Sequence, residues 1–88
     1  MKIGIIKVSP RFEQCYRKLP AHIRTQAKER EKIFRENPFQ PSLKTHKLHG
    51  QEKDAWAFSV NYDYRIKFIF LGDAEVLFLD IGTHDIYR

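Results

Sequence analysis

Residues 64–81 read YRIKFIFLGDAEVLFLDI. Two runs rich in aromatic and β-branched residues, 64–71 and 75–81, flank Gly72 and Asp73, a pair typical of a tight turn between antiparallel strands. The second run is almost continuously apolar, as is usual for a central strand that is covered on both faces. This stretch therefore predicts a β-hairpin in the middle of a sheet.

Two further strands are predicted upstream of this hairpin. In residues 55–61, Trp56, Phe58 and Val60 alternate with Ala57 and Ser59, which is the period of two that a strand requires. Residues 43–49 form a second candidate strand, and the polar segments 51–54 and 61–63 supply the turns. Because short turns join consecutive strands, we expect the four strands after residue 42 to pair antiparallel.

The first half of the chain predicts one strand, at residues 3–8, and then two helices. Ser9 and Pro10 begin the first helix as N-cap and first helical residue. The second helix spans about 20–37 and is stopped by Asn37 and Pro38, before a loop over 38–42. The order β-α-α-β-β-β-β predicts a single α+β domain over residues 1–88, a mostly antiparallel sheet with both N-terminal helices on one face. The apolar stripe of the first helix is Phe12, Cys15, Tyr16 and Leu19.

Composition excludes several classes of protein. The chain has 88 residues, 42% of them hydrophobic, which is enough for one packed core and excludes wholesale disorder. Its one cysteine, Cys15, allows neither an internal disulfide nor a cysteine metal cluster. No apolar run approaches the roughly 20 residues of a membrane span, and the short apolar N-terminal run does not suit a signal peptide. We therefore expect a cytoplasmic protein with no membrane partner.

Positive charge is concentrated in the first part of the chain. Residues 1–53 carry 13 Lys and Arg against 5 Asp and Glu, whereas residues 54–88 carry 3 against 6, for a net charge of +5. Such a distribution favours a polyanionic partner, either nucleic acid or an acidic protein. A solvated basic helix face explains the same numbers, so charge alone leaves both interpretations open.

The strand at 64–71 carries the first candidate group. Tyr64, Ile66 and Phe68 share one face, and Arg65 and Lys67 share the other. If the aromatic face packs on the helices, the two cations point outward and are suited to hold a phosphate. The alternative is an arginine paired with Asp63 or Asp80 on the sheet surface.

The segment 44–50 carries the second candidate group. On a strand, Lys44, His46 and Leu48 face one way, and Lys47 and His49 the other. His46 can act as a general acid or base. The spacing His-x-x-His also occurs in metal sites, but it suits a helix better than a strand and no third ligand follows, so no metal site is predicted.

The C-terminal segment 82–88 gathers His84, Tyr87 and Arg88 at the end of the last strand. Together the three groups predict metal-independent RNA cleavage. That reaction needs a base for the ribose 2′-hydroxyl, cations for the charged phosphorane and an acid for the leaving 5′-oxygen. Only RNA carries the 2′-hydroxyl, so DNA is not a substrate by this route.

Six segments, taken in order, resemble the RelE/ParE superfamily of bacterial toxins. The likeness covers nearly the whole chain. It implies the microbial-RNase-like toxin fold and ribosome-dependent cleavage of messenger RNA without a cofactor. It also implies a cognate acidic antitoxin encoded beside the toxin, which is then a monomer alone or part of a heteromer with that antitoxin. The segments are 12–20, 37–39, 43–50, 56–60, 64–68 and 77–87, the last ending in Gly-Thr-His-Asp-Ile-Tyr.

The resemblance also implies roles for single residues. Arg65, in a Tyr-Arg-Ile pattern, matches the arginine that RelE-like enzymes use on the scissile phosphate. His46 and Asp63 match catalytic positions of the YafQ-like branch, and His84 matches its C-terminal catalytic histidine. Tyr87 resembles the C-terminal tyrosine of RelE-like members, at a shorter spacing. The residues expected to bind RNA around them are Lys44, Lys47, Lys67 and Arg88.

The chain also departs from these patterns. RelE has two lysines on the strand after the glycine, where this chain has Ala57 and Ser59, and YafQ-like members have a histidine at the position of Ser59. His46, with Asp63, is therefore the expected base, and this assignment is the one that the departures affect most. Two alternatives stay open: a ParE-like toxin that inhibits DNA gyrase without nuclease activity, and a binding module whose catalytic set has decayed.

Overall fold

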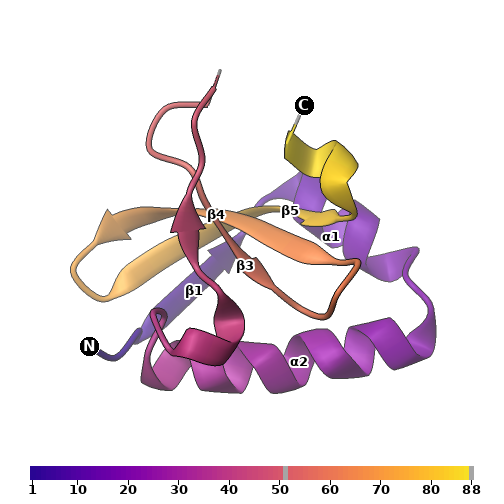
Figure 1. Cartoon of the computed structure of the whole chain (residues 1–88), viewed down its shortest axis with the longest axis horizontal. Helices are drawn as coiled ribbons and strands as arrows, with labels where there is room; N and C mark the ends of the chain where they lie inside the picture. Colours follow the sequence, from indigo (N-terminus) through magenta and orange to yellow (C-terminus); the bar gives the residue numbers. More distant parts are fainter. Residues whose placement is uncertain (51, 88) are drawn as a thin grey trace.

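The computed structural model describes residues 1–50 and 52–87, with the backbone alone at residues 85 and 87. A strand, two helices and four more strands follow one another, as the sequence predicts (Figure 1). Two 3₁₀ turns, η1 and η2, complete the chain. The elements are β1 (Ile5–Val8), α1 (Pro10–Arg17), α2 (Ala21–Glu36), η1 (Pro41–Leu43), β2 (His46–Lys47), β3 (Trp56–Ser59), β4 (Arg65–Gly72), β5 (Glu75–Gly82) and η2 (His84–Tyr87).

The five strands form one sheet in the order β1-β5-β4-β3-β2. β1 pairs parallel with β5, and the other three pairings are antiparallel. The predicted α+β architecture with a mostly antiparallel sheet is therefore confirmed. Figure 1 shows α2 lying along one side of the sheet, while η2 and the loop between β2 and β3 rise on the other side.

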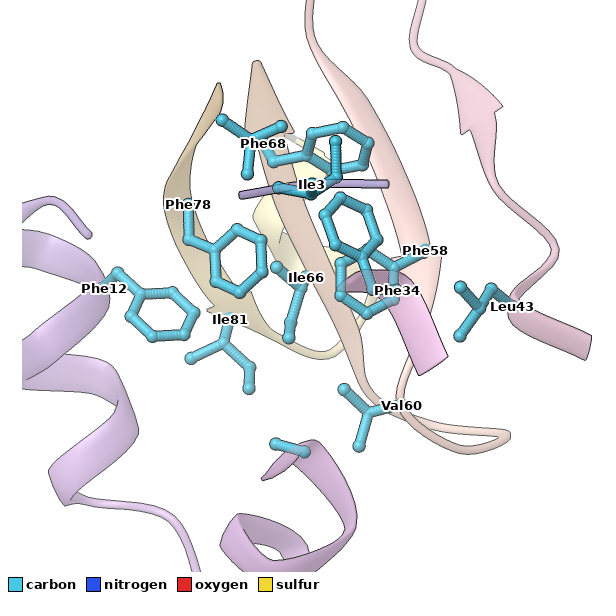
Figure 2. Packing of buried hydrophobic residues seen from close by; sticks show 12 residues of the cluster. Ile3, Phe12, Phe34, Leu43, Phe58, Val60, Ile66, Phe68, Phe78 and Ile81 are labelled. Atoms are coloured by element: carbon cyan, nitrogen blue, oxygen red, sulfur yellow. The ribbon is translucent and has the colours of Figure 1, made fainter. Parts of the chain in front are cut away.

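The core fills the space between the sheet and the helices. Phe34 of α2 is fully buried, and its ring centroid lies 4.6 Å from that of Phe58, 5.0 Å from that of Phe68 and 5.6 Å from that of Phe78 (Figure 2). These three rings come from β3, β4 and β5, so one helical side chain holds three strands together. Phe12 of α1 adds a further ring, 5.4 Å from Phe78. Among the described residues, no helix has the length and apolar character needed to cross a membrane.

Ser9 fixes the start of α1 against the sheet. Its Oγ accepts a hydrogen bond from the backbone N–H of Phe12 at 3.0 Å, which is the predicted N-cap, and donates one to the carbonyl of Leu79 at 2.8 Å. The second bond joins positions 70 residues apart and docks α1 on β5. α2 ends as predicted, directly before Asn37 and Pro38.

The predicted strand over 43–49 is much shorter in the structure. Only His46 and Lys47 pair with β3. Pro41 instead begins the η1 turn, and Lys44 follows with a φ of 52°, in the left-handed region. A strand cannot run through such a residue, so Lys44 does not share the strand face that the sequence predicts for it with His46 and Leu48.

The pairing register between β4 and β5 shifts by one residue at Leu79. Lys67 pairs with Asp80 whereas Phe68 pairs with Phe78, so Leu79 has no partner in the ladder. Without this shift, strict alternation from Phe78 would turn Asp80 toward the core and Ile81 away from it. The shift lets Ile81 join the core and places Asp80 opposite Lys67.

Candidate active site

The sheet has a polar face on the side away from α2. Residues directly opposite each other on neighbouring strands point to the same side of a sheet. His46 pairs with Ala57, and Ala57 with Lys67, while one step further along the sheet Ser59 pairs with Arg65. The predicted candidates His46 of β2 and Arg65 and Lys67 of β4 therefore share one face. We define the polar face by His46 of β2, Arg65 and Lys67 of β4, and Asp80 of β5.

Arg65 is half-buried at the start of β4, and its side chain folds back over the preceding turn. Its Nη1 donates to the carbonyls of Asn61 at 2.6 Å, Tyr62 at 2.9 Å and Tyr64 at 3.1 Å. All the hydrogen bonds that the described part of the chain gives this side chain use Nη1. The Nε and Nη2 edge of the guanidinium remains suited to bidentate contact with a phosphate.

Asn61 organises the turn that holds Arg65. Its Oδ1 accepts from the backbone N–H of Asp63 at 2.9 Å and of Tyr64 at 2.8 Å, and its Nδ2 donates to Gln26 of α2 at 2.8 Å. Its own carbonyl accepts from Arg65. Sequence reasoning identified the turn but not this role, and the signal available was the preference of Asn for turns in which its side chain bonds the backbone two residues on.

His46 stands at the opposite end of the polar face. Its side chain is exposed, and Nδ1 lies 3.0 Å from the carbonyl oxygen of Lys44. Two strand spacings and two residues of rise separate it from Arg65, which corresponds to roughly 12 Å between Cα atoms. Lys44 and Lys47 are both exposed in the same segment.

His84 follows β5 at the end of the sheet where Arg65 lies. Arg65 pairs with Gly82, the last residue of β5, and η2 begins at His84, which is exposed. Ile86 of the same turn is buried against the protein. A Cβ atom on Gly82 would lie 2.7 Å from Cγ2 of Ile86, so this close approach requires glycine. The segment 82–87, expected as a short tail, is thus an ordered turn seated on the sheet.

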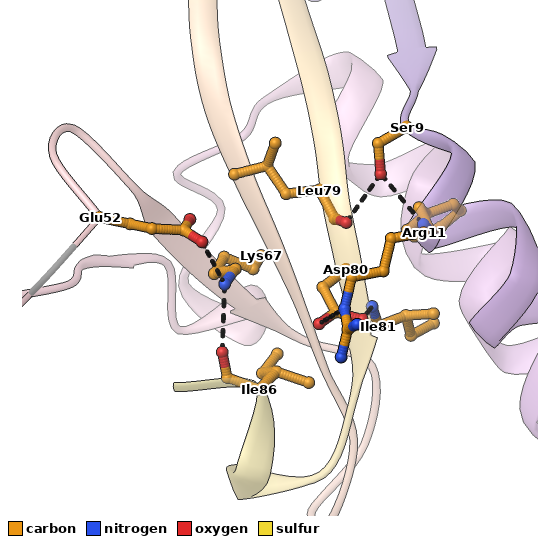
Figure 3. A network of polar contacts seen from close by, with 9 residues as sticks. Ser9, Arg11, Glu52, Lys67, Leu79, Asp80, Ile81 and Ile86 are labelled. Carbon is orange, nitrogen blue, oxygen red and sulfur yellow. Dashed lines mark hydrogen bonds and ion pairs between the residues drawn. The ribbon is translucent and has the colours of Figure 1, made fainter. Parts of the chain in front are cut away.

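Lys67 is more buried than the sequence predicts. Only 8% of its surface is exposed, and its ammonium donates to Oε1 of Glu52 at 3.0 Å and to the carbonyl of Ile86 at 3.2 Å (Figure 3). These partners come from the β2–β3 loop and from η2. The ammonium lies on the polar face, as predicted, but between two protein partners rather than in open solvent.

Asp80 is also engaged, with α1 rather than with Arg65. It is 3% exposed, and its Oδ2 accepts from Nε of Arg11 at 2.9 Å, so the alternative pairing of Arg65 with Asp80 does not occur. The hydrogen bond that Asp80 accepts from Arg11, and then the negative charge of Asp80, raise the pKa of the Arg11 guanidinium. Burial raises the pKa of the Cys15 thiol on the same helix, and the hydrogen bond with Asp80 raises it further.

The remaining predicted residues fall at the rim or outside the described atoms. Asp63 is exposed in the turn before Arg65, and no ion pair among the described residues joins the two. The side chain of Tyr87 and the whole of Arg88 lie outside the described part of the chain. Tyr62, which sequence reasoning did not select, is 89% exposed beside Arg65. The signal that could have identified Tyr62 is an aromatic residue in an otherwise polar turn.

The arrangement suits proton transfer around a bound phosphate. Arg65 provides a fixed cation on β4, His46 lies on β2, and His84 follows β5, the neighbouring strand on the other side of β4. Within the residues that the structure describes, no three His, Cys, Asp or Glu side chains are grouped so as to hold a metal ion.

Comparison with solved structures identifies this fold. A YoeB/ParE toxin from Agrobacterium tumefaciens is similar over 92% of this chain and 99% of its own, with a TM-score of 0.77 and 13% identity. An archaeal RelE in a RelE–RelB complex from Pyrococcus horikoshii covers 94% and 96%, with a TM-score of 0.74 and 19% identity. A chain of the E. coli DinJ–YafQ toxin–antitoxin complex covers 98% and 97%, with a TM-score of 0.72 and 21% identity.

No protein-family model and no curated protein matches the sequence of the chain. At 13 to 21% identity, the likeness to the three structures establishes the architecture. The chain therefore has the fold of the RelE, YoeB/ParE and YafQ toxins.

Proposed function

We propose that this chain is the toxin of a type II toxin–antitoxin pair and that it cleaves messenger RNA on the ribosome. The reaction is a metal-independent attack of a ribose 2′-hydroxyl on the adjacent phosphate. One observation carries the proposal: Arg65 lies on a strand between the two elements that bear His46 and His84. In-line displacement at phosphorus needs a base and an acid on opposite sides of a stabilised phosphorane, and this order supplies all three groups.

The roles follow from this order. Arg65 stabilises the phosphorane through the Nε and Nη2 edge of its guanidinium. His46, with Asp63, takes the proton of the 2′-hydroxyl, and His84 gives a proton to the leaving 5′-oxygen. Tyr87 positions or stacks on a base. The cations that hold flanking phosphates are Lys44, Lys47 and Arg88.

The partner in the cell is an acidic antitoxin. Two of the similar structures are complexes, RelE with RelB and YafQ with DinJ, and the net charge of +5 favours an acidic chain. Steering by charge makes the association rate fall as salt rises, whereas the apolar part of the contact leaves the dissociation rate nearly constant. Co-expression with the adjacent open reading frame, followed by kinetics across a salt series, tests this. Failure of any neighbour-encoded protein to co-purify or to rescue growth would contradict the pairing.

The activity itself is tested by pulse expression with transcript 5′-end mapping, and by incubating the purified protein with programmed ribosomes. Wild-type protein should arrest growth and create new 5′-hydroxyl ends opposite 2′,3′-cyclic phosphates. Arg65→Ala should abolish the new ends. Arg35→Ala, on α2 and ion-paired with Glu31, is the matched arginine control and should behave as wild type.

The outcomes separate the alternatives. Growth arrest without new transcript ends would favour the ParE-like gyrase inhibitor, and neither effect would favour the decayed binding module. Scission should also continue when the magnesium of programmed ribosomes is replaced by a polyamine that keeps the subunits joined. A requirement for a divalent ion in the scission step would contradict the mechanism.

A further inference from the structure

Lys67 is a buried cation that the proposed chemistry does not require. Its side chain is 10% exposed, and its ammonium is held between Glu52 and the carbonyl of Ile86. A buried ammonium is costly unless it is paired and hydrogen-bonded, so both partners are needed to keep it there. The two partners lie 15 and 19 positions from Lys67 in the chain. The ammonium therefore joins the β2–β3 loop to η2.

The segment on one side of this contact is η2, which bears His84. Among the described residues, Ile86 contacts the sheet in two ways: its carbonyl accepts from Lys67, and its buried side chain lies close to Gly82. Gly82 is also the pairing partner of Arg65. A change that frees Ile86 is therefore expected to loosen the turn that bears His84.

We propose that Lys67 is a positioning residue, whose ammonium anchors η2 through the Ile86 carbonyl and so holds His84 beside Arg65. The inference rests on the proposed function for its catalytic part. Glu52 has the complementary task of neutralising the buried charge, and at 54% exposure it does so from the solvent side. Two of the three ammonium protons of Lys67 already have protein acceptors, and the anchoring role needs no contact between this lysine and the phosphate.

The competing interpretation is the direct RNA contact that the sequence predicts for this lysine. It requires the RNA phosphate to displace Glu52, and its loss would weaken substrate binding. The anchoring role predicts that kcat changes and KM does not. Loss of the anchor lowers kcat because His84 is misplaced, and leaves KM within about twofold because the phosphate contacts remain.

The test compares Lys67→Met and Lys67→Arg with a control, Lys53→Met. Lys53 is an exposed lysine of the β2–β3 loop, next to Glu52. Methionine keeps the buried stem without the ammonium, whereas arginine can donate to both acceptors. Amide exchange by NMR reports on η2 through the Ile86 N–H, which bonds the Thr83 carbonyl at 3.1 Å. Cleavage is measured on ribosomes programmed with a defined mRNA, and thermal unfolding checks the fold. If Lys67→Met does not fold, Lys67→Gln takes its place.

In Lys67→Met we expect a 10- to 100-fold loss of protection at Ile86 and a comparable fall in kcat, both restored by arginine and both absent in the control. Unchanged protection overturns the anchor. A rise in KM with kcat retained overturns it in favour of RNA contact. Loosened η2 with wild-type kcat overturns the positioning role. If the wild-type protein does not cleave at all, the proposed function fails, and the exchange data alone decide whether Lys67 anchors η2.

Discussion

Replacing Arg65 by lysine separates the two tasks that the structure gives this side chain. Its Nη1 satisfies three carbonyls of the β3–β4 turn, while the Nε and Nη2 edge is left for a phosphate. A guanidinium can do both because its donors are fixed in a planar fork, whereas an ammonium is a single point charge on a flexible stem. Arg65→Lys therefore keeps the charge and loses the simultaneous contacts.

The magnitudes follow from these contacts. Removing one cation aimed at a phosphorane costs about 3 kcal/mol of transition-state stabilisation, or about a hundredfold in rate. Arg65→Ala should show this full loss of rate. Arg65→Lys should cleave less than tenfold faster than Arg65→Ala. Loss of the turn contacts should lower the free energy of unfolding by about 1 to 2 kcal/mol in Arg65→Ala. For a domain of this size that corresponds to a Tm lower by roughly 5 to 15 °C.

Single-turnover cleavage on programmed ribosomes measures the rate, and urea unfolding measures the stability. Both are compared with Arg35→Ala. A folded Arg65→Ala protein that cleaves at the wild-type rate would refute the assignment of Arg65 to the phosphate. A fully active Arg65→Lys protein would refute the two-task argument while leaving the need for a cation intact.

Four other predictions follow from contacts described above. Phe34→Ala should lower the free energy of unfolding by about 3 to 5 kcal/mol in urea titration, because it leaves a cavity among three aromatic rings. Ser9→Ala should cost about 1 to 2 kcal/mol in the same assay, since it removes an N-cap and a second hydrogen bond. Tyr62→Ala should raise KM for ribosome-bound mRNA about tenfold if its exposed ring stacks on a base, with Tyr62→Phe unchanged. Cys15 should react with iodoacetamide more slowly at pH 8 than a free thiol, because its raised pKa lowers the thiolate fraction, and Asp80→Asn should accelerate the reaction.

The elements that the sequence predicts well are those set by neighbouring residues. The hairpin over 64–81 is an example, because alternation is a local signal and its partner strands adjoin it in the chain. Its turn lies at Asp73 and Ala74, one residue later than predicted, because Gly72 still pairs with Glu75. The N-cap at Ser9 is another, since the cap and the N–H that it accepts from are three residues apart. The placement of Arg65 on the face away from the core follows from the same alternation.

The features that sequence reasoning missed depend on distant residues. The burial of Lys67 is set by Glu52 and Ile86, neither of which is near it in the chain. The face of the sheet on which Asp80 lies depends on a register shift at Leu79, and alternation in the sequence does not reveal this shift. The strand expected over 43–49 is reduced to His46 and Lys47, because Pro41 begins a 3₁₀ turn and Lys44 adopts a left-handed conformation.

The parallel pairing of β1 with β5 has a consequence for how the chain folds. Ile5 pairs with Glu75, so the contact closes a loop that contains both helices and three strands. Closing a loop of this length is slow compared with forming the hairpins of β3, β4 and β5. During synthesis, α1 and α2 therefore leave the ribosome before the strands on which they pack exist. Folding into the native sheet must wait until β5 has been made, so a nascent chain that stops short of β5 lacks the docking strand for both β1 and α1.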